Sequence, residues 1–465
     1  MNSSTPFACP EDVYEWISGF INTESGQKHR EFRLDTMNAL AKLAERPEKY
    51  APAIHVAGTK GKGSVTGMIG AILEAAGKKI ACYFSPHVSN FRERLTMGKH
   101  FFNEEIYVQS GNELRDLAER FSALRGTIPP GIDSPAPGDI SFFELMTLWF
   151  FLSARLAGAD VMAVETGMGG RLDATNILDP IVSVITIIEL EHTEYLGDTI
   201  AAIAAEKAGI IKPGRPLVLA EQSDEALSVF KEYAARNNSP FLYFPDHVEI
   251  KDIRCGLNGT FFSASFKSVH SKSEKEILEN LFIPIPGEIQ ARNASLAILA
   301  VKTAFPLIGE KDIREGLASF SLPARFEKIS DSPPVIIDGS HTGRSTELCV
   351  STFTSLYGHD NILIFGCAAG KNVSAMAECC ISNFSKIIIT APGTFKKSFP
   401  SEINEIFCSI RERLKKKPEI HFLPNTEEAI CMAIEMAHKF NLAVLGTGSF
   451  YLAAEIRSRV MSSQG

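Results

Sequence analysis

A segment rich in glycine and lysine, HVAGTKGKGSVTGMIG at residues 55–70, has the residue types needed to bind a phosphate group. Gly58, Gly61 and Gly63 allow the backbone to turn its N–H groups toward an anion, and a helix that follows adds its positive end. Lys62 supplies a full positive charge. We therefore interpret the segment as a phosphate-binding loop.

The loop departs from the common Walker A pattern at two positions. Val56 stands where that pattern has its first glycine, and Gly63 stands where it has serine or threonine. Ser64, one position later, can offer a hydroxyl group to a phosphate or to Mg²⁺. A tight turn that binds nothing is the alternative, but such a turn does not need Lys60 and Lys62 beside its glycines. Phosphate binding is therefore the prediction.

Three further polar residues, Ser85, Glu165 and His192, fall at the ends of later predicted strands. The carboxyl ends of parallel strands line the ligand crevice of an open sheet, so we expect these side chains to converge beside the loop. A hydroxyl group, a carboxylate and an imidazole there can hold Mg²⁺. Taken alone, His192 is more often a hydrogen-bonded histidine and Glu165 could cap a helix. The joint placement of the three indicates a metal site.

Lys207 lies in a helical pattern, AAIAAEKAGIIKPG. Neither its spacing nor its neighbours give it a special role. The residues alone therefore predict an ordinary surface lysine.

The elements that position these residues alternate between β-branched runs and helical patterns, which is typical of a parallel sheet covered by helices. Buried strands are predicted at residues 53–58, 79–84, 159–165 and 181–188. After the loop, a helix is predicted to begin near Ser64, with apolar residues at helical spacing up to a possible end at Gly77. The loop is therefore expected between a strand and a helix.

Residues 221–285 break the alternation, and we interpret them as a small antiparallel insertion rather than another βαβ unit. A second alternating series follows, with strands predicted at residues 333–338, 361–366, 386–392, 419–424 and 442–446. Pro323 interrupts the helical pattern before this series. We therefore place a domain boundary at Leu322, which gives domains of residues 1–322 and 323–465.

Composition excludes several classes of function. The chain has 465 residues and a net charge of −8, so it has no broad basic field and we expect no nucleic-acid partner. Its nine cysteines, odd in number and without a CxxC motif, fit a reducing cytoplasm better than a disulfide framework or a zinc site. The N-terminal residues lack a signal-peptide pattern, and Arg155 interrupts the most apolar run. We therefore expect a cytoplasmic protein that does not bind a membrane.

Taken together, these motifs resemble those of the folylpolyglutamate synthase and dihydrofolate synthase family, within the Mur ligase superfamily. The resemblance covers most of the chain, in the family's order, and any one of its segments would be weak alone. The segments are HVAGTKGKGS, YFSPHVSNFRERLTMGKHFFNEEIY, VETGMGGRLDATN, EHTEYLGDTIAAIAAEKAGIIKPG, RNASLAILA, ARFE and GTGSFYLAAEIR.

The resemblance implies a two-domain α/β fold. Its N-terminal domain is a P-loop-type Mur ligase ATPase domain with a parallel sheet and a small antiparallel insertion. Its C-terminal domain is Rossmann-like and binds the amino acid. The family's loop reads GTxGKG followed by Ser or Thr, so Gly63 and Ser64 look like this variant of the phosphate-binding loop.

The resemblance also implies roles for individual residues. ATP would be bound by residues of the loop and by four residues further along the chain: Gly58, Thr59, Gly61, Lys62, Gly63, Ser64, Asn293, Arg325, Asp338 and His341. Ser85, Glu165 and His192 match the family's Mg²⁺ ligands, and the loop after Ser85 would help to form the pterin or folate site. Lys207 matches a lysine that the family carries as a carbamate. Lys62, His192 and Lys207 are thus the implied catalytic residues.

The implied reaction is ATP-dependent amide ligation, with ATP and Mg²⁺ as cofactors. ATP phosphorylates a substrate carboxylate, and the amino group of L-glutamate then displaces phosphate from the acyl phosphate. The carboxylate would belong to dihydropteroate, to a reduced folate such as tetrahydrofolate, or to both. We expect a monomer whose partners are these small molecules.

Several positions depart from the family pattern. Asp338 and His341 remain, but Thr342 and Gly343 replace its Asn and Pro, and Gly370 and Asn372 flank a lysine where the family has Asp on both sides. Glu191 stands where Asp is usual. The C-terminal changes fall in the domain that binds the amino acid, so they bear on glutamate specificity more than on ATP use.

Two alternatives remain open from the sequence. One is a Mur-type amide ligase that acts on another carboxylate acceptor. The other is a homologue that binds ATP with little catalysis and serves in binding or regulation.

Overall fold

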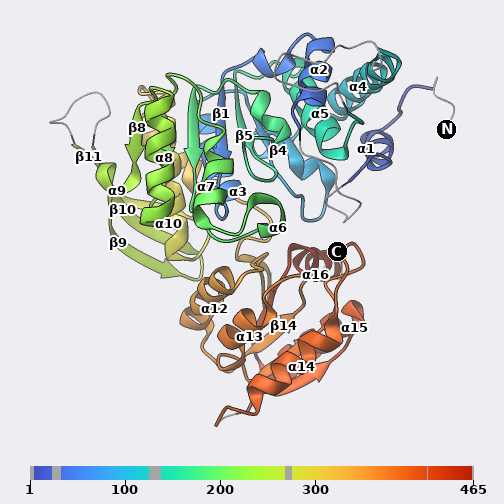
Figure 1. Cartoon of the computed structure of the whole chain (residues 1–465). Helices are drawn as coiled ribbons and strands as arrows, with labels where there is room; N and C mark the ends of the chain where they lie inside the picture. Colours follow the sequence, from blue (N-terminus) through green and yellow to red (C-terminus); the bar gives the residue numbers. More distant parts are fainter. Residues whose placement is uncertain (1–4, 23–32, 125–137, 268–274, 416, 463–465) are drawn as a thin grey trace.

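The computed structural model describes residues 5–22, 33–124, 138–267, 275–415 and 417–462. Over these ranges the chain forms two α/β parts, each built on its own sheet (Figure 1). We call the elements up to residue 318 the N-terminal part and those from residue 327 the C-terminal part. None of the helices in the described ranges is long and apolar enough to cross a membrane.

The N-terminal part contains an eight-stranded sheet in the order β4-β3-β2-β5-β1-β6-β7-β8. Its strands are β1 (Ala53–Ala57), β2 (Ile80–Tyr83), β3 (Leu95–Met97), β4 (His100–Phe101), β5 (Val161–Glu165), β6 (Val182–Ile185), β7 (Leu217–Leu219) and β8 (Phe241–Tyr243). The strands from β2 to β8 in this order run parallel, whereas β3 and β4 form an antiparallel edge. The four strands predicted in this region are confirmed as β1, β2, β5 and β6.

Helices cover both faces of this sheet because side chains alternate along its strands. Ile54 and Val56 of β1 pack on the side of α3 (Lys62–Ala75), α10 (Glu288–Ala304) and α11 (Glu310–Ala318). Ala53 packs on the opposite side. The helices there are α1 (Pro10–Ser18), α2 (Asp35–Leu43), α4 (Glu104–Leu124) and α5 (Phe142–Leu156). Near β6 and β7 lie α6 (Thr193–Leu196), α7 (Ile200–Ala208) and α8 (Asp224–Arg236).

The predicted antiparallel insertion is shorter than expected. Only β9 (Val248–Gly256), β10 (Gly259–Lys267) and β11 (Lys275–Ile283) form the antiparallel sheet. The prediction was wrong for residues 221–247. In this range α8 connects β7 to β8, and β8 pairs in parallel with β7 as the last strand of the main sheet. The short helix α9 (Phe244–His247) then leads into β9. The three residues of β8 are too few to show a strand pattern in the sequence.

The C-terminal part contains a six-stranded sheet in the order β12-β13-β17-β14-β15-β16, parallel except for β12. Its strands are β12 (Glu327–Asp331), β13 (Pro334–Ile337), β14 (Ile362–Phe365), β15 (Lys386–Ile389), β16 (Glu419–Phe422) and β17 (Val444–Thr447). Its helices are α12 (Gly343–Tyr357), α13 (Val373–Ile381), α14 (Pro400–Arg411), α15 (Thr426–Phe440) and α16 (Phe450–Ser462). All five strands predicted after the proposed boundary are confirmed, and β12 was missed.

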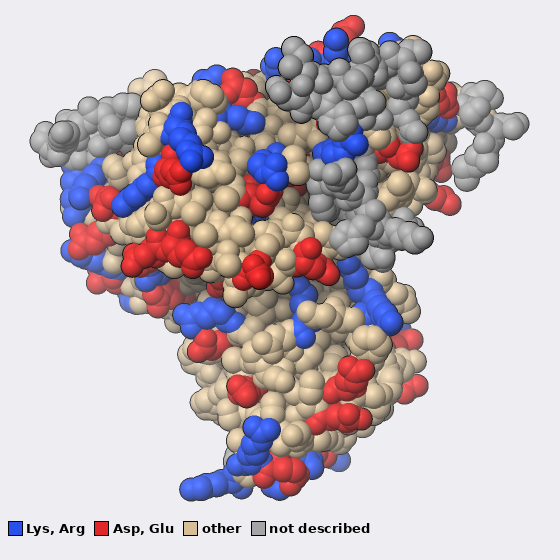
Figure 2. All heavy atoms as spheres, viewed as in Figure 1, with Lys and Arg blue, Asp and Glu red and all other residues tan. Residues whose placement is uncertain are grey.

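The predicted boundary at Leu322 falls between α11 and β12, in the connection between the two parts. The division into residues 1–322 and 323–465 stays a prediction. On the face seen in Figure 2, Lys and Arg side chains are interspersed with Asp and Glu and form no broad basic surface.

Candidate active site

The phosphate-binding loop joins the end of β1 to the start of α3, as predicted. Gly58 and Gly61 have φ angles of 147° and 88°. A Cβ atom at Gly58 would lie 1.8 Å from Thr186 Oγ1, and one at Gly61 would lie 2.8 Å from Asn293 Oδ1. Both the backbone angles and the lack of space therefore require glycine at these positions.

Thr59 connects the loop by hydrogen bonds to the segment after β6. Its N–H donates to the Ile187 carbonyl at 2.9 Å. Its Oγ1 donates to the Glu189 carbonyl at 3.2 Å and accepts from the Glu189 N–H at 3.1 Å. Because this hydroxyl group is already engaged within the protein, a contact between Thr59 and a nucleotide stays a prediction.

The start of α3 provides the positive potential of the loop. The helix begins at Lys62, slightly before the start predicted near Ser64, and Gly61 is its N-cap. Lys62 is half-buried, with Nζ 3.5 Å from the Thr59 carbonyl, and Ser64 is buried. The free N–H groups of the first helical turn and the Lys62 ammonium can together bind a phosphate group.

The structure brings Ser85 and Glu165 together beside the loop. Glu165 ends β5, and its Oε2 accepts a hydrogen bond from the Ser85 N–H at 3.2 Å. A Cβ atom at Gly63 would lie 3.4 Å from the same oxygen. Burial raises the pKa of Glu165, and the charge of Lys62 opposes this shift. The Ser85 hydroxyl is buried and has no hydrogen-bond partner, so it is open to a ligand.

His192 lies after β6, on the turn before α6, with a φ angle of 53°. The residue as a whole is exposed, but the surrounding protein removes solvation from the ring and lowers its pKa to about 4. Lys371, Lys62 and Lys207 add to the shift, whereas Glu191 opposes it. At neutral pH the ring is therefore uncharged, with a lone pair that can bind a metal ion.

Mg²⁺ fits the chemistry of the predicted ligands, because Glu165 and Ser85 supply oxygen atoms and Ser85 Oγ has no other partner. In the described part of the chain, no three His, Cys, Asp or Glu side chains form a ready-made metal site. A site here therefore depends on the serine hydroxyl. Joint binding of one ion by Ser85, Glu165 and His192 stays a prediction.

Lys207 is buried, and the surface position expected from its spacing was wrong. Only 4% of the residue is exposed, because α7 packs closely against the segment around Gly170. Its Nζ donates to the Gly58 carbonyl at 2.7 Å. Burial, with the charge of Lys62, lowers the pKa of Lys207 to about 7. Near neutral pH a large share of this lysine is therefore uncharged.

Arg325 reaches the loop from the connection into the C-terminal part. One of its guanidinium nitrogens, Nη2, would lie 3.6 Å from a Cβ atom at Gly63. The ring of Phe450 lies against the guanidinium, with Cζ 4.3 Å from the ring centroid. Burial lowers the pKa of Arg325, while Asp338 and Glu165 oppose the shift. This cation is held at the junction of both parts.

Backbone N–H groups hold the Asp338 carboxylate in place. Its two oxygens accept hydrogen bonds from the N–H groups of Phe326 and Ser340, both at 2.8 Å. His341 follows and lies next to Glu191, with 2.9 Å between Nε2 and Oε1. Asp338, His341 and Arg325 therefore all lie where the C-terminal part meets the N-terminal part.

Sequence reasoning missed two residues that hold the others in position. Phe450 contacts the guanidinium of Arg325 and lies 5.7 Å from the His341 ring, centroid to centroid. Gln290 accepts a hydrogen bond from Asn293 Nδ2 at 3.2 Å, and Asn293 Oδ1 lies against Gly61. Phe450 stands in the noted segment GTGSF, whereas the sequence around Gln290 gave no signal for its role.

The C-terminal departures from the family pattern have structural roles. Thr342 is the N-cap of α12, and its Oγ1 accepts a hydrogen bond from the Ser345 N–H at 3.4 Å. Asn372 is the N-cap of α13, and its Oδ1 accepts from the Ala375 N–H at 3.1 Å. Gly370 has a φ angle of 81° and open space around its Cβ position. These residues therefore start helices or form a turn.

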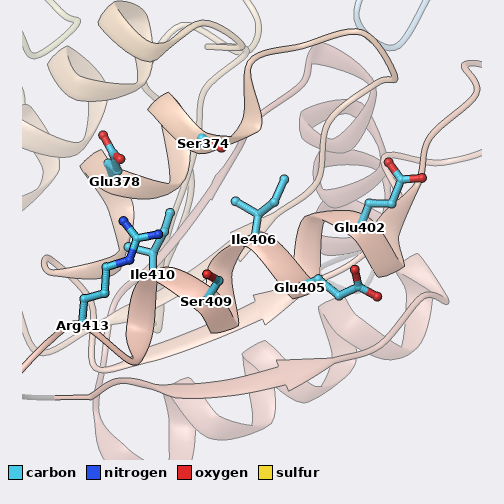
Figure 3. Close-up of a pocket in the computed structure, with 8 residues that line it drawn as sticks. All are labelled: Ser374, Glu378, Glu402, Glu405, Ile406, Ser409, Ile410 and Arg413. Atoms are coloured by element: carbon cyan, nitrogen blue, oxygen red, sulfur yellow. The ribbon is translucent and has the colours of Figure 1, made fainter.

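A hollow of about 370 Å³ lies elsewhere, between α13 and α14 (Figure 3). It is lined by Ser374, Glu378, Glu402, Glu405, Ile406, Ser409, Ile410 and Arg413. None of the predicted site residues lines it. Its glutamates would repel a nucleotide, so the phosphate-binding loop stays the candidate active site.

Comparisons with known proteins show the family of this chain. The Mur ligase middle domain family matches residues 114–301, and the family described as Mur ligase, glutamate ligase domain matches residues 324–450. The dihydrofolate synthase/folylpolyglutamate synthase of Bacillus subtilis (strain 168) is 30% identical over 462 residues, covering 98% of this chain and all of that protein. This chain belongs to the folylpolyglutamate synthase and dihydrofolate synthase family of Mur ligases.

Solved structures of this family share the fold. A folylpolyglutamate synthase of Mycobacterium tuberculosis, complexed with ADP and AMPPCP, has a TM-score of 0.81 and 25% identity, over 92% of this chain and 95% of that one. A folylpolyglutamate synthase (FPGS) structure described as an FPGS–AMPPCP–folate complex has a TM-score of 0.80 and 26% identity, over 98% of this chain and 100% of that one. The predicted family and α/β fold class are confirmed, and the chain is a ligase of the Mur type.

Proposed function

We propose that this chain is an ATP-dependent ligase that joins L-glutamate to a folate-type carboxylate through an acyl phosphate. One observation carries the proposal. Glu165 Oε2 and Arg325 Nη2 both lie next to the Cβ position of Gly63, so a carboxylate of the N-terminal part and a cation of the connection meet at the phosphate-binding loop. The relatives named above from Bacillus subtilis and Mycobacterium tuberculosis are, by their names, a dihydrofolate synthase/folylpolyglutamate synthase and a folylpolyglutamate synthase.

The loop would bind the phosphates of ATP. The N–H groups at the start of α3 and the Lys62 ammonium would stabilise the oxygens of the phosphoryl group during transfer. Gly58 and Gly61 allow the backbone to take this shape. Much of the catalysis would therefore come from positioning and charge.

Ser85, Glu165 and His192 would hold Mg²⁺ beside this loop. When bound, the ion would neutralise charge on the phosphate oxygens of the substrate. The buried Glu165 carboxylate and the unpartnered Ser85 hydroxyl support this assignment.

The C-terminal part would complete the nucleotide site. We propose that Asp338 binds ATP from this part, that Arg325 binds it from the connection and Asn293 from α10, with His341 beside them. The hydrogen bonds to Asp338 and the contact between Arg325 and Phe450 support these roles, because they fix each side chain before a ligand arrives. A closed arrangement would also exclude water and protect the acyl phosphate.

In the reaction, a carboxylate oxygen of the acceptor attacks the γ-phosphorus of ATP, and ADP leaves. The amino nitrogen of L-glutamate then attacks the acyl carbon of the acyl phosphate. Inorganic phosphate leaves as the amide bond forms, and the nitrogen loses a proton to solvent or to a nearby base. The acceptor would be dihydropteroate, a reduced folate, or both.

We also propose that Lys207 reacts with CO₂ to form a carbamate. Carbamates form on the neutral amine, and the low pKa of the buried Lys207 supports this chemistry. The competing role is structural, because the unmodified ammonium already donates to the Gly58 carbonyl. The domain division at Leu322, a monomeric state and a cytoplasmic location are further parts of the proposal.

A single assay tests the function and its alternatives. The purified protein is given ATP, Mg²⁺ and radiolabelled L-glutamate with dihydropteroate, with tetrahydrofolate, or with cell-wall precursors. We expect label in a folate product. Label only in a cell-wall product would indicate a different Mur-type ligase, and ATP binding without any product would indicate a binding or regulatory homologue.

A further inference from the structure

One carboxylate oxygen joins the two parts of the molecule. Glu191 Oε1 lies 2.7 Å from Lys60 Nζ, 2.9 Å from His341 Nε2 and 3.8 Å from Lys371 Nζ. Lys60 belongs to the phosphate-binding loop, whereas His341 and Lys371 follow β13 and β14 of the C-terminal part. Glu191 itself precedes the proposed metal ligand His192.

This cluster is partly shielded from water. The side chain of Glu191 is 10% exposed, and those of Lys60, His341 and Lys371 are 20%, 23% and 26% exposed. Ion pairs in such surroundings are screened less than pairs at an open surface. The contact is therefore stronger than an ordinary exposed salt bridge.

The Glu191 carboxylate lies between lysines of the two parts, whose positive charges would otherwise repel each other. Burial lowers the pKa of Lys60, and the positive charges of Lys371 and Lys62 lower it further, while Glu191 opposes the shift. Lys371 has no acidic neighbour in its own segment, because Gly370 and Asn372 flank it. Without Glu191, the lysines of the two parts would repel each other across their junction.

We propose, on the basis of the function proposed above, that Glu191 is a positioning residue that docks the C-terminal part on the phosphate-binding loop. Its carboxylate holds His341 and Lys371 against Lys60. This contact places Arg325 and Asp338 opposite the loop, where they can bind the nucleotide. The proposal gives Glu191 no direct contact with a substrate.

The test uses the full chain with the substitutions Glu191→Gln and Glu191→Asp. Glu194→Gln is the matched control, because Glu194 carries the same charge on the same segment but is exposed. Two measurements are made: the affinity for AMPPCP with Mg²⁺, by calorimetry, and the hydrogen exchange of backbone amides in residues 338–342 and 366–372. Neither measurement requires ligation.

We expect Glu191→Gln to weaken AMPPCP binding roughly tenfold and to speed amide exchange in both C-terminal segments. Glu191→Asp, which keeps the charge, should restore part of both effects, and Glu194→Gln should change neither. A local structural role would alter exchange only around residue 191. Unchanged exchange at residues 338–342 and 366–372, or unchanged AMPPCP affinity, would overturn the proposal. If the parent protein binds AMPPCP but ligates no substrate, the proposed function fails while this test still decides the role of Glu191.

Discussion

In the phosphate-binding loop, a Cβ atom at Gly58 or Gly61 would overlap a neighbouring side chain, whereas a Cβ atom at Gly370 in the C-terminal part would have open space around it. The loop is thus fixed by close contacts that allow one residue type. On the C-terminal side, the positions next to Lys371 serve a turn and a helix cap, which several residue types can provide. This difference explains how the chain can keep the family's loop while departing from its C-terminal pattern.

Lys207 beside the loop and Glu191 at the junction of the two parts also differ in how the protein surrounds their charges. Lys207, on the loop side, is buried with a backbone carbonyl as its hydrogen-bond partner and has a pKa of about 7. Glu191 is partly buried among cations. Its loss of solvation alone would raise its pKa, but the hydrogen bond with His341 and the charge of Lys60 hold the pKa well below its usual range. We therefore expect Lys207 to react as a neutral amine and Glu191 to hold the C-terminal part on the loop.

The largest expected effect is on the loop side. Lys62→Ala should lower ATP turnover by roughly 100- to 1000-fold, because a preorganised charge at the phosphoryl group is lost. The free energy of unfolding should change little, since Lys62 is half-buried and packs in no core. Turnover and thermal unfolding are measured together, with the exposed Lys311→Ala as control. A folded Lys62→Ala protein with the parent turnover would contradict the loop assignment.

A pair of glycine substitutions tests the comparison directly. Gly58→Ala should destabilise the protein by about 3 kcal/mol or more, because its Cβ would overlap Thr186 Oγ1 and its φ is unfavourable. Gly370→Ala should cost only about 1 kcal/mol, from its backbone angle alone. Urea unfolding of both variants provides the measurement. Equal losses of stability would show that the loop is no more constrained than the C-terminal turn.

Substitution of Lys207 separates the carbamate from a structural role. Lys207→Ala should lower ligation roughly 10- to 100-fold, and short carboxylic acids should restore part of the activity by filling the gap. The parent protein should lose activity when bicarbonate is removed. Full activity of Lys207→Ala without added acid would argue against the carbamate.

The titration of Lys207 adds a pH dependence with a definite sign. Because its folded pKa of about 7 lies below the value of about 10.4 expected in the unfolded chain, the unfolded state binds more protons between these values. The free energy of unfolding should therefore rise with pH from about 7 to about 10, and Lys207→Ala should remove this contribution. Urea unfolding in CO₂-free buffers across that range checks the slope.

The smallest expected effect is on the C-terminal side. Because Gly370 and Asn372 replace acidic residues, we expect a high Michaelis constant for L-glutamate, or preference for another amino acid. Asn372→Asp keeps the N-cap and adds a carboxylate that can pair with the substrate ammonium group, so it should lower this constant up to about tenfold. Competition among amino acids at fixed ATP and folate provides the measurement. Tight and exclusive use of L-glutamate by the parent would show that these replacements are neutral.

Local patterns predicted most of the fold and the loop. Buried strands such as β1 and β14 were found because a buried strand leaves a mostly apolar run in the sequence. The three-residue β8 and the edge strand β12 leave no such pattern, so they were missed. The shape of the loop followed from the spacing of its glycines.

The environment of single side chains was harder to predict. The burial of Lys207 depends on how α7 packs against the segment around Gly170, which no local spacing reports. The contact between Glu191 and His341 joins residues far apart in the chain and depends on how the two parts approach each other. Such contacts arise from tertiary packing, so a single sequence could not show them.

The hydrogen bond between the Thr59 N–H and the Ile187 carbonyl has a consequence for the order in which the site is assembled during synthesis. The phosphate-binding loop leaves the ribosome well before its anchor, and Asn293, which lies against Gly61, follows later still. Domains form as units from the N-terminus during translation. A nascent chain would therefore lack Asn293 beside the loop until α10 has been synthesised, and lack Asp338 until the C-terminal part follows.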